Sequence, residues 1–483
     1  MRSVGQLVKA AQSRIGSELL LGLIMSAALV LRLLYLGRKS LWLDETASVE
    51  MARMDWPSFV HELAHAELHH GANMTLYHLL LRRWVLLGDS EWLLRSLSVI
   101  FSLATLPVLY ALGTRLFGRR VGLVSALLLA VNAFHVKYAQ EARSYSLLVL
   151  LLTVASWLFV ESIEKSRVQH WVGYVLTSVL ALYSHFFAAF VVLAHWVSLL
   201  FVRDRKVPWT ALAASTLAIG LLVLPLALYI LRVGSDPLEW VQPPGAGAMR
   251  GVLFAFAGGS DGAGWLFLVA CLGGVVAHRT WLSGAARAES WYLGFVVAWL
   301  LVPLLTVLAL SRIQPMFVDR YLIICLPAFI LLAALGLSSI SNPRVFAVAL
   351  AVMMVVSTFR VFHYYEKSSR EDWRDATQYI LTHAEAGDAL VFFRPHVRRC
   401  YEYYRERLID APRVTIDVPI AEESPSAVAF DQLKSRYRRV WVVLSHAPSD
   451  TIRRLRELAQ ARYAVVEERQ FLGVEVLQYR ADD

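Results

Sequence analysis

Long apolar runs separated by short polar loops occupy most of the chain. A straight helix needs about 20 apolar residues to cross the roughly 30 Å hydrocarbon core of a bilayer. Several runs are shorter than this, so their limits are approximate, and together they predict a polytopic α-helical membrane protein with about 11 transmembrane helices. The runs lie near residues 18–36, 92–114, 121–136, 147–161, 170–183, 186–202, 209–231, 253–277, 290–310, 321–338 and 345–362.

The pattern changes after Phe362, where charged residues and short elements replace the apolar runs. We expect helices at residues 370–383 and 449–461 and strands at 389–393, 440–444 and 474–479. The chain is therefore expected to comprise a transmembrane domain at residues 1–362, with a long loop at 37–90, and a soluble α/β domain at residues 363–483.

Composition supports a membrane protein and limits its partners. The 483 residues are 57% hydrophobic and 18% charged, with a mean hydropathy of +0.51, which is too apolar for an ordinary soluble protein. The formal charge of +9 comes mostly from short basic clusters between apolar runs, so we do not expect nucleic acid as a partner. The cysteines Cys271, Cys325 and Cys400 have no spacing typical of a disulfide framework or a paired-cysteine metal site.

The distribution of Lys and Arg predicts the topology. If residues 73–88 do not cross the membrane, the N-terminus and the more basic loops lie on one side, which is the positive-inside pattern. Arg82 and Arg83 interrupt residues 73–88, so we interpret this segment as an interfacial amphipathic helix. The first apolar run is too long for a usual signal-peptide core and is expected to be a retained anchor. The outer face then receives the loop at 37–90 and the C-terminal domain.

An adjacent acidic pair, Asp44-Glu45, follows the first apolar run and the segment Leu41-Trp42-Leu43. Such neighbours suit the membrane boundary, where carboxylates can face water. In a partly dry pocket, one carboxylate can accept a proton from an attacking hydroxyl while the other orients it or accepts a hydrogen bond. A solvated loop has the same composition, so the pair alone leaves both interpretations open.

Two segments at the outer ends of apolar runs combine Arg with Tyr. Each can serve as an interfacial anchor, but guanidinium groups at headgroup depth also suit bidentate binding of a lipid phosphate or pyrophosphate. His185 lies in a short outer turn, where it is either a packing residue or part of the same cavity. The candidate binding residues of the two segments are Tyr138, Glu141, Arg143, Tyr145, Arg320 and Tyr321.

The segment His61-Glu62-Leu63-Ala64-His65 matches the H-E-x-x-H pattern of zinc metalloproteases. On a helix this spacing places two imidazoles on one face, with the Glu beside them as a general base. Glu67, His69 or His70 would then supply a third ligand. The segment is rich in histidine, however, so a chance match is common, and a polar interfacial helix shows the same pattern. A divalent metal is thus a weak candidate cofactor.

Taken in order, several segments resemble the integral-membrane GT-C glycosyltransferases. The greatest similarity is to the branch that contains the protein O-mannosyltransferases and the bacterial aminoarabinose transferases of lipid A. The resemblance covers nearly the whole chain, including the tail. The segments are Leu41-Trp42-Leu43-Asp44-Glu45, Leu76-Tyr77-His78-Leu79-Leu80 with Trp84, 88–91 with Arg95, 140–145, 183–187, 319–322, Trp373-Arg374-Asp375 and Gly387-Asp388.

This resemblance implies inverting transfer of a sugar from a polyprenyl-phosphate donor to an acceptor at the outer face of the membrane. It makes Asp44 the general base, with Glu45 beside it, and assigns the donor phosphate or sugar to Arg143, Tyr145, Arg320 and Tyr321. Because Arg can neutralise the departing lipid phosphate, no metal is required.

The chain departs from the family pattern at one point. Many relatives have a His-Pro-Pro or Lys-Pro element before the Leu-Tyr segment, whereas this chain has His69-His70-Gly71-Ala72-Asn73. A Lys contact to phosphate therefore does not transfer, and we expect His70 or Asn73 to take its place.

We predict a GT-C-like glycosyltransferase of the bacterial inner membrane, with its active site and C-terminal domain outside the cytoplasm. Its partners would be a polyprenyl-phosphate sugar, the membrane, and an acceptor glycan, lipid or protein. One alternative is a flippase or transporter of polyprenyl-linked sugars, which would not need the carboxylate pair. The other is a zinc membrane protease acting through His61, Glu62 and His65.

Overall fold

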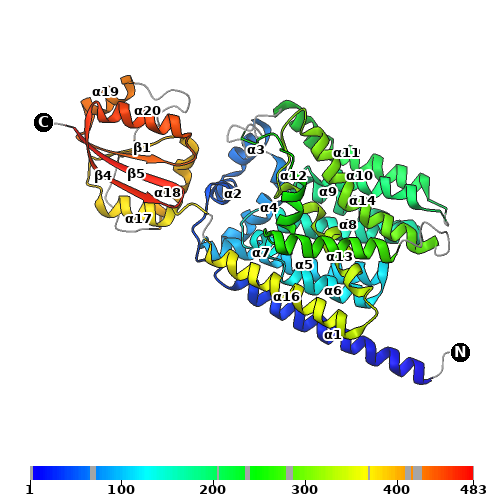
Figure 1. The fold of residues 1–483 in the computed structure, drawn as a ribbon. Coiled ribbons are helices and arrows are strands. Elements are labelled where there is room, and N and C mark those ends of the chain that lie inside the picture. Colours follow the sequence, from blue (N-terminus) through cyan, green and yellow to red (C-terminus); the bar gives the residue numbers. More distant parts are fainter. Residues whose placement is uncertain are drawn as a thin grey trace. The chain divides into compact units, whose positions relative to one another are not determined.

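The computed structural model describes residues 4–65, 72–203, 206–233, 240–278, 287–367, 370–407, 415–416 and 427–481. It divides into two compact units, both drawn in Figure 1. The helical unit comprises Met1–Leu36, Asp55–Gly88 and Trp92–Glu366. The tail unit comprises Gly37–Met54, Asp89–Glu91 and Lys367–Asp483, so it combines the C-terminal residues with part of the first long loop.

Helices form almost all of the described helical unit. The longer ones are α1 (Val4–Leu33), α5 (Glu91–Phe117), α8 (Tyr145–Lys165), α9 (Val168–Ser184), α11 (Trp209–Val233), α13 (Asp261–Ala277), α14 (Arg287–Leu310), α15 (Leu326–Ser338) and α16 (Pro343–Glu366). The shorter ones are α3 (Trp56–His65), η1 (Ala72–Met74), α4 (Thr75–Trp84), η2 (Val85–Leu87), α6 (Arg119–Ala130), α7 (Ala133–Ala139), α10 (Ala188–Ser198), η3 (Leu199–Phe201), α12 (Ala248–Phe256) and η6 (Tyr321–Cys325).

The prediction of a polytopic α-helical membrane protein is confirmed. Seven helices among the described residues are long and apolar enough to cross a membrane, or nine if the bent pairs α6–α7 and α12–α13 each form one span. The expected number was about 11, and the difference lies in α9 and α10. α9 has 17 residues and α10 has 11, so each is shorter than a straight span.

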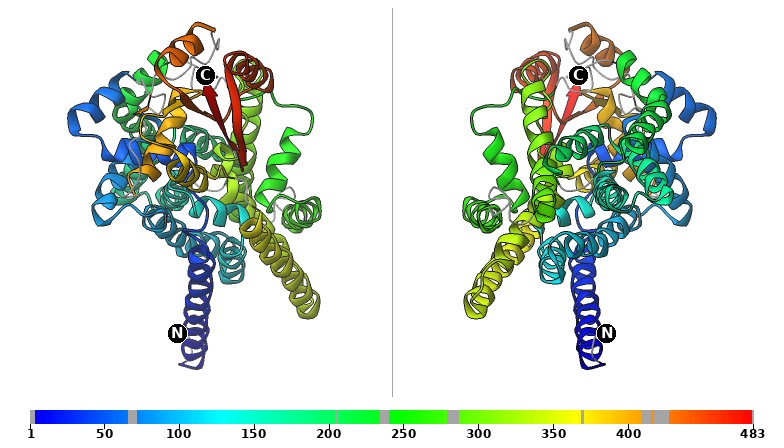
Figure 2. Two further views of the ribbon diagram at one scale, coloured as in Figure 1. Left: turned by 90° about the vertical axis from the view of Figure 1, so that its left-hand side faces the viewer. Right: turned by 90° about the vertical axis from the view of Figure 1, so that its right-hand side faces the viewer.

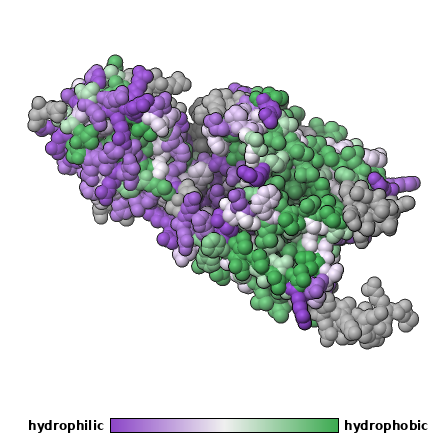
Figure 3. Space-filling view, in the orientation of Figure 1, coloured by the Kyte–Doolittle hydropathy of each residue, from purple (hydrophilic) through white to green (hydrophobic). Residues whose placement is uncertain are grey.

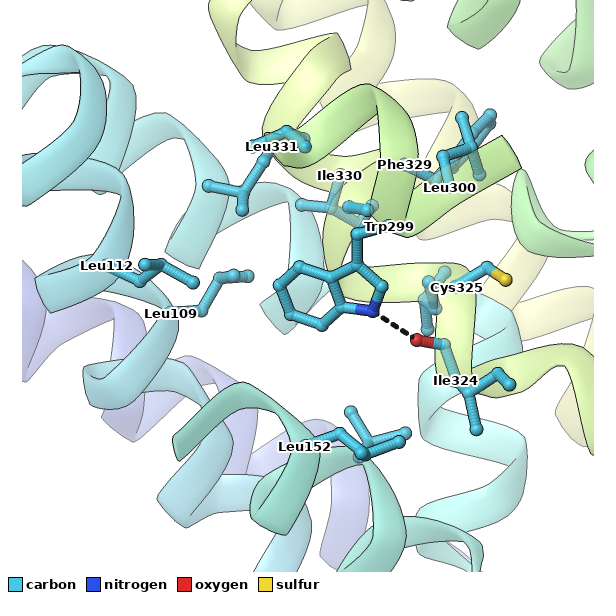
Figure 4. Packing of buried hydrophobic residues seen from close by; sticks show 14 of the residues in the cluster. Leu109, Leu112, Leu152, Trp299, Leu300, Ile324, Cys325, Phe329, Ile330 and Leu331 are labelled. Carbon is cyan, nitrogen blue, oxygen red and sulfur yellow. Dashed lines mark hydrogen bonds between the residues drawn. The ribbon is translucent and has the colours of Figure 1, made fainter. Parts of the chain in front are cut away.

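The centre of the helical unit is packed around η6, α14 and α15. In the span formed by η6 and α15, 83% of the residues are buried. The Trp299 Nε1 donates a hydrogen bond to the Ile324 carbonyl oxygen at 2.9 Å, which satisfies the indole inside an apolar cluster (Figure 4). Gly274 on α13 and Gly336 on α15 allow close backbone approach: a Cβ on Gly274 would lie 2.9 Å from the Gly336 nitrogen.

Two helices at the edge of the unit are mostly exposed, with 22% of the α1 span and 17% of the α16 span buried. They diverge from the end where the Tyr365 hydroxyl donates to the Leu31 carbonyl oxygen (Figure 2). The surface of the helical unit is largely hydrophobic in Figure 3, whereas that of the tail unit is largely hydrophilic. Apolar exposure on this scale is expected where lipid replaces water as the solvent.

Residues 73–88 form no helix of membrane-spanning length, as expected from the topology. They comprise part of η1, the ten-residue α4 and η2. Tyr77, His78 and Leu81 are buried on one face of α4, while Arg83 and Leu86 are exposed. The segment is thus amphipathic, and its buried face packs against α9 within the helical unit.

The tail unit contains a sheet between two layers of helices (Figure 1). The described strands have the order β2-β1-β3-β5-β4, in which β1 is parallel to β2 and β3, and β5 is antiparallel to β3 and β4. The elements are α2 (Leu43–Arg53), α17 (Trp373–His383), β1 (Ala389–Phe392), η7 (Pro395–Val397), α18 (Arg398–Arg405), β2 (Thr415–Ile416), α19 (Ala427–Arg436), β3 (Arg439–Leu444), α20 (Ser449–Gln460), β4 (Tyr463–Phe471) and β5 (Val474–Ala481).

The degree of burial of each strand explains which strands could be predicted from the sequence. β1 is buried throughout and β3 nearly so, as expected for parallel strands covered on both faces, and both were anticipated. β4 was not anticipated from the sequence. As an edge strand it is mostly exposed and carries the charged run Glu467-Glu468-Arg469. It joins β5 through Gly473, whose φ of +71° suits glycine.

Candidate active site

The segment between α7 and α8 is held in place by the end of α1. α6 and α7 meet at a bend of 59°, where the Asn132 side chain accepts a hydrogen bond from the His135 backbone nitrogen and caps α7. Arg32 on α1 is buried and donates to the carbonyl oxygens of Leu129 and Ala130 at the C-terminal end of α6, where backbone carbonyl groups need partners from outside the helix. The residues that follow α7 therefore start from a fixed position.

Four aromatic rings from separate parts of the helical unit lie beside one another. The Tyr138 and Tyr145 ring centroids are 5.0 Å apart, those of Tyr145 and His185 are 6.3 Å apart, and those of His185 and Tyr321 are 5.1 Å apart. Tyr138, Tyr145 and His185 are almost completely buried. Residues predicted from three distant segments of the sequence are thus brought together.

The turn between α9 and α10 orients His185. The Phe187 backbone nitrogen donates to His185 Nδ1 at 3.2 Å, so Nδ1 is the acceptor nitrogen of the ring. The Asn73 Oδ1 accepts a hydrogen bond from the Phe186 nitrogen at 3.0 Å. Asn73 therefore supports the turn, and its predicted contact with the substrate stays a prediction.

Charged side chains surround the aromatic rings. Arg143 and Arg320 both lie close enough to His185 for their charges to act on it. Asp319, Glu141 and Arg320 lie within electrostatic range of Tyr138. Two guanidinium groups and two carboxylates are thus grouped around buried rings in one unit, which gives a polar cluster next to an apolar wall.

Two of these residues have further fixed partners. The Ser98 hydroxyl donates to the Arg143 carbonyl oxygen at 3.2 Å and pairs with the Tyr77 hydroxyl at 2.9 Å. The Arg320 guanidinium lies 4.7 Å from the ring centroid of Trp240, a cation–π distance. Trp240 and His78, which is buried within range of the Arg143 charge, were not among the predicted site residues. Trp240 and His78 lie far from Arg320 and Arg143 in the sequence, so no local pattern linked them.

The predicted acid pair belongs to the tail unit. Asp44 and Glu45 lie in the first turn of α2. Glu45 is fully buried, and its Oε2 lies 3.5 Å from the Arg370 Nη1. Because the two carboxylates have different surroundings, they are suited to different roles.

A histidine of the tail unit lies within reach of the Asp44 charge. His446 Nε2 pairs with Glu371 Oε1 at 2.6 Å. The hydrogen bond to Glu371 raises the pKa of His446, and the negative charges of Glu371 and Asp44 act in the same direction, against burial and the Arg394 charge. His446 was not anticipated from the sequence, because nothing in the chain order links it to Asp44.

The H-E-x-x-H segment lies at the C-terminal end of α3. His61 is exposed and Glu62 is 4% exposed, so these two side chains face different surroundings. His69 and His70 lie outside the described residues. Within the described parts of the chain, no three His, Cys, Asp or Glu side chains are grouped as a metal site would require.

Comparison with known proteins identifies the class of fold. Residues 76–230 match the model of the family described as dolichyl-phosphate-mannose-protein mannosyltransferase. No sequence among the curated proteins matches the chain.

Solved structures match over almost the entire chain. ArnT from Cupriavidus metallidurans in the apo state is 15% identical with a TM-score of 0.66, covering 97% of this chain and 98% of ArnT. ArnT bound to undecaprenyl phosphate gives a TM-score of 0.66 at 14% identity, covering 94% and 97%. The archaeal oligosaccharyltransferase AglB from Archaeoglobus fulgidus, in complex with an inhibitory peptide and a dolichol-phosphate, gives 0.53 at 12% identity, covering 89% and 69%.

These similarities confirm the predicted resemblance to the GT-C integral-membrane glycosyltransferases. The chain is an integral membrane protein with the GT-C fold and a small C-terminal sheet domain. The family model matches residues 76–230, and the solved structures share the fold over most of the chain.

Proposed function

We propose that the protein transfers a sugar from a polyprenyl-phosphate donor to an acceptor at the outer face of the membrane, with Asp44 as the general base. The observation that carries this proposal is the grouping of Arg143, Arg320 and His185 with buried tyrosines in a fold shared with ArnT. The matched structures of ArnT and AglB contain undecaprenyl phosphate and dolichol-phosphate, respectively.

The chemistry assigns the two units different tasks. A carboxylate at Asp44 accepts the proton of the acceptor hydroxyl as its oxygen attacks the anomeric carbon of the donor. The bond from that carbon to the phosphate oxygen breaks, and the lipid phosphate leaves with the electron pair. Arg143 and Arg320 stabilise the charge that develops on the phosphate, while the tyrosines and His185 form the wall for the sugar.

The topology supports an extracytoplasmic site. Seven of the described helices are long and apolar enough to cross, or up to nine if each bent pair is one span, and an odd number of crossings would leave the N-terminus and the tail on opposite sides of the membrane. The basic loops favour the N-terminal side as the cytoplasmic one. We therefore assign the tail unit and Asp44 to the outer face of the bacterial inner membrane.

The direct test uses purified full-length protein and a small panel of polyprenyl-phosphate sugars, with release of lipid phosphate as the measurement. We expect release with at least one sugar and an acceptor extract from the cell envelope. Asp44→Asn should abolish release while leaving polyprenyl phosphate binding unchanged. Normal sugar transfer by Asp44→Asn would refute the assignment of the base.

Metal dependence is tested in the same assay. The variants His61→Ala and His65→Ala should retain transfer, since the proposed chemistry needs no metal at this segment. Loss of transfer in both variants, with restoration by added zinc, would instead support a metal site there.

A further inference from the structure

The helix that carries Asp44 is fixed to the C-terminal part of the tail unit on both sides of Asp44. Before it, the Ser40 hydroxyl donates to the Glu371 carbonyl oxygen at 2.6 Å, and the Leu41 nitrogen donates to the Tyr404 hydroxyl at 2.6 Å. After it, the Thr46 hydroxyl lies 3.1 Å from the Cys400 sulfur. These contacts restrict the backbone immediately before and after Asp44.

A buried ion pair adds a charged contact next to Asp44. Glu45 is fully buried and Arg370 is 8% exposed, with 3.5 Å between Glu45 Oε2 and Arg370 Nη1. Removing one partner of a buried pair leaves the other charge uncompensated, so the contact is sensitive to small changes in position. Glu45 contacts the tail, whereas a group that takes a proton from the acceptor must be able to reach it.

The same region of the tail carries charged groups near Asp44. Glu371 joins the contacts, because its carbonyl accepts from Ser40, its carboxylate accepts from Trp373 Nε1 at 2.7 Å, and it pairs with His446. Asp44 in turn lies within electrostatic range of His446. Backbone contacts and nearby charges around Asp44 therefore come from the same short stretches of the C-terminal residues.

We propose that the C-terminal domain is a positioning element for the catalytic base: it holds α2 in the orientation that presents Asp44, and Glu45 is a positioning residue paired with Arg370. This inference rests on the proposed role of Asp44. A displacement of a reacting group by about 1 Å can cost about 100-fold in rate, so loss of the Glu45 contact should act on turnover.

The test compares Glu45→Gln with the wild-type full-length enzyme. We expect kcat to fall about 30- to 100-fold while KM for the lipid donor changes by less than about 3-fold, because the predicted donor-binding arginines lie in the helical unit. Arg370→Gln should lower kcat to a similar extent, with an equally small change in KM. The double variant should lose no more than either single variant, since the two residues act as a pair.

Thiol labelling of Cys400 reports whether α2 has shifted. Cys400 is fully buried beside Thr46, and burial raises the pKa of its thiol, so labelling of the wild type should be slow. Peptide mapping after maleimide treatment should show faster labelling of Cys400 in Glu45→Gln. Equal labelling rates and equal kcat in the two proteins would overturn the inference.

The chain offers a matched control on the same helix. Glu50 also pairs with an arginine of α18, with 3.3 Å between Glu50 Oε2 and Arg399 Nε, but Glu50 is more exposed and lies about 9 Å along the helix from Asp44. Glu50→Gln should change kcat by less than about 3-fold. An equal loss in Glu50→Gln and Glu45→Gln would show a general effect of α2 stability and would contradict a specific anchor.

Two outcomes separate this inference from the proposed function. Full activity of Asp44→Asn would refute the base and leave the contacts of α2 without a catalytic purpose. Inactive Asp44→Asn together with fully active Glu45→Gln would retain the base and refute the positioning role. If Glu45→Gln does not fold, Arg370→Gln, which removes the charge, is measured in its place, and a kcat equal to that of the wild type would refute the positioning role.

Discussion

In the helical unit, the buried Arg32 is met by backbone carbonyl oxygens, the Ser102 hydroxyl and the His135 ring. In the tail unit, the buried Glu45 is met by the Arg370 guanidinium, and Glu371 pairs with His446. The first arrangement gives hydrogen-bond partners to backbone carbonyl groups at a helix bend. Within a membrane such groups must find their partners inside the protein, because lipid offers none. The second links separate segments by charge, so it responds to pH and to single charge changes.

This contrast corresponds to the proposed division of the chemistry. The arginines that would bind the donor phosphate lie in the unit where neutral groups hold the buried Arg32, while the base lies in the unit where an ion pair holds the buried Glu45. If the two units contribute independently, a substitution in one unit should leave the contribution of the other unchanged.

The largest expected effect is on turnover. Asp44→Asn removes the proton acceptor and should lower kcat about 1,000-fold, within the range typical of general base catalysis. Its affinity for polyprenyl phosphate, measured by calorimetry or by a competition assay, should equal that of the wild type. A large loss of lipid affinity would show that Asp44 also serves the donor site.

A smaller effect is expected from the helical unit. Arg320→Gln removes a charged hydrogen-bond donor from the proposed phosphate site and should weaken donor binding about 10- to 100-fold. The change should appear in KM for the donor rather than in Cys400 labelling, which reports only on the tail unit. Arg312→Gln, which alters another arginine in the segment between α14 and η6, is the control and should bind the donor normally.

Packing of the helical unit predicts a loss of stability at Gly274. A methyl group there would lie 2.8 Å from the Leu332 carbonyl oxygen and force α13 and α15 apart, so Gly274→Ala should destabilise the protein by about 1–3 kcal/mol. Thermal unfolding in detergent measures this. The neighbouring Gly273 has open space around its Cβ position, and Gly273→Ala should be neutral or slightly stabilising.

A Gly→Ala substitution in the tail unit would act through the backbone conformation instead of packing. Gly387 has a φ of +93° but no atoms within 4 Å of a Cβ, so only conformational strain opposes Gly387→Ala. We expect a loss of about 1 kcal/mol, measured by hydrogen exchange of β1. If Gly387→Ala lost as much stability as Gly274→Ala, packing and not backbone conformation would be the cause of the loss at this turn.

The smallest effect concerns pH. The pKa of His446 is raised in the folded state, so its pairing with Glu371 contributes its full stabilisation of the folded state below about pH 6.5. This contribution is lost as the pH rises through the raised pKa. The side chain is 38% exposed, so the stabilisation should stay below about 1 kcal/mol. Hydrogen exchange of residues 370–373 should therefore differ between wild type and His446→Gln at pH 6 and converge at higher pH. A difference that does not change with pH would contradict the ionic contribution.

Much of the helical unit could be predicted because apolar runs of membrane length have few alternatives to a helix. The residues of the proposed donor site could also be selected, since Arg and Tyr at the ends of apolar runs are unusual enough to mark them. Bends were not visible: the α6–α7 junction depends on Arg32, which reaches it from another helix. The edge strand β4 was missed because hydrogen bonding to β5, and not hydrophobic alternation, makes it a strand.

The sequence by itself determined the membrane class, the apolar segments, the acidic pair and the arginines, because each depends on the composition of a short stretch. Only the tertiary structure decided that Glu45 is buried against Arg370, that His185 and Tyr321 are neighbours, and that α2 belongs to the tail unit. Each of these facts joins residues far apart in the chain. Their contacts depend on the folding of the intervening segments, which no local pattern specifies.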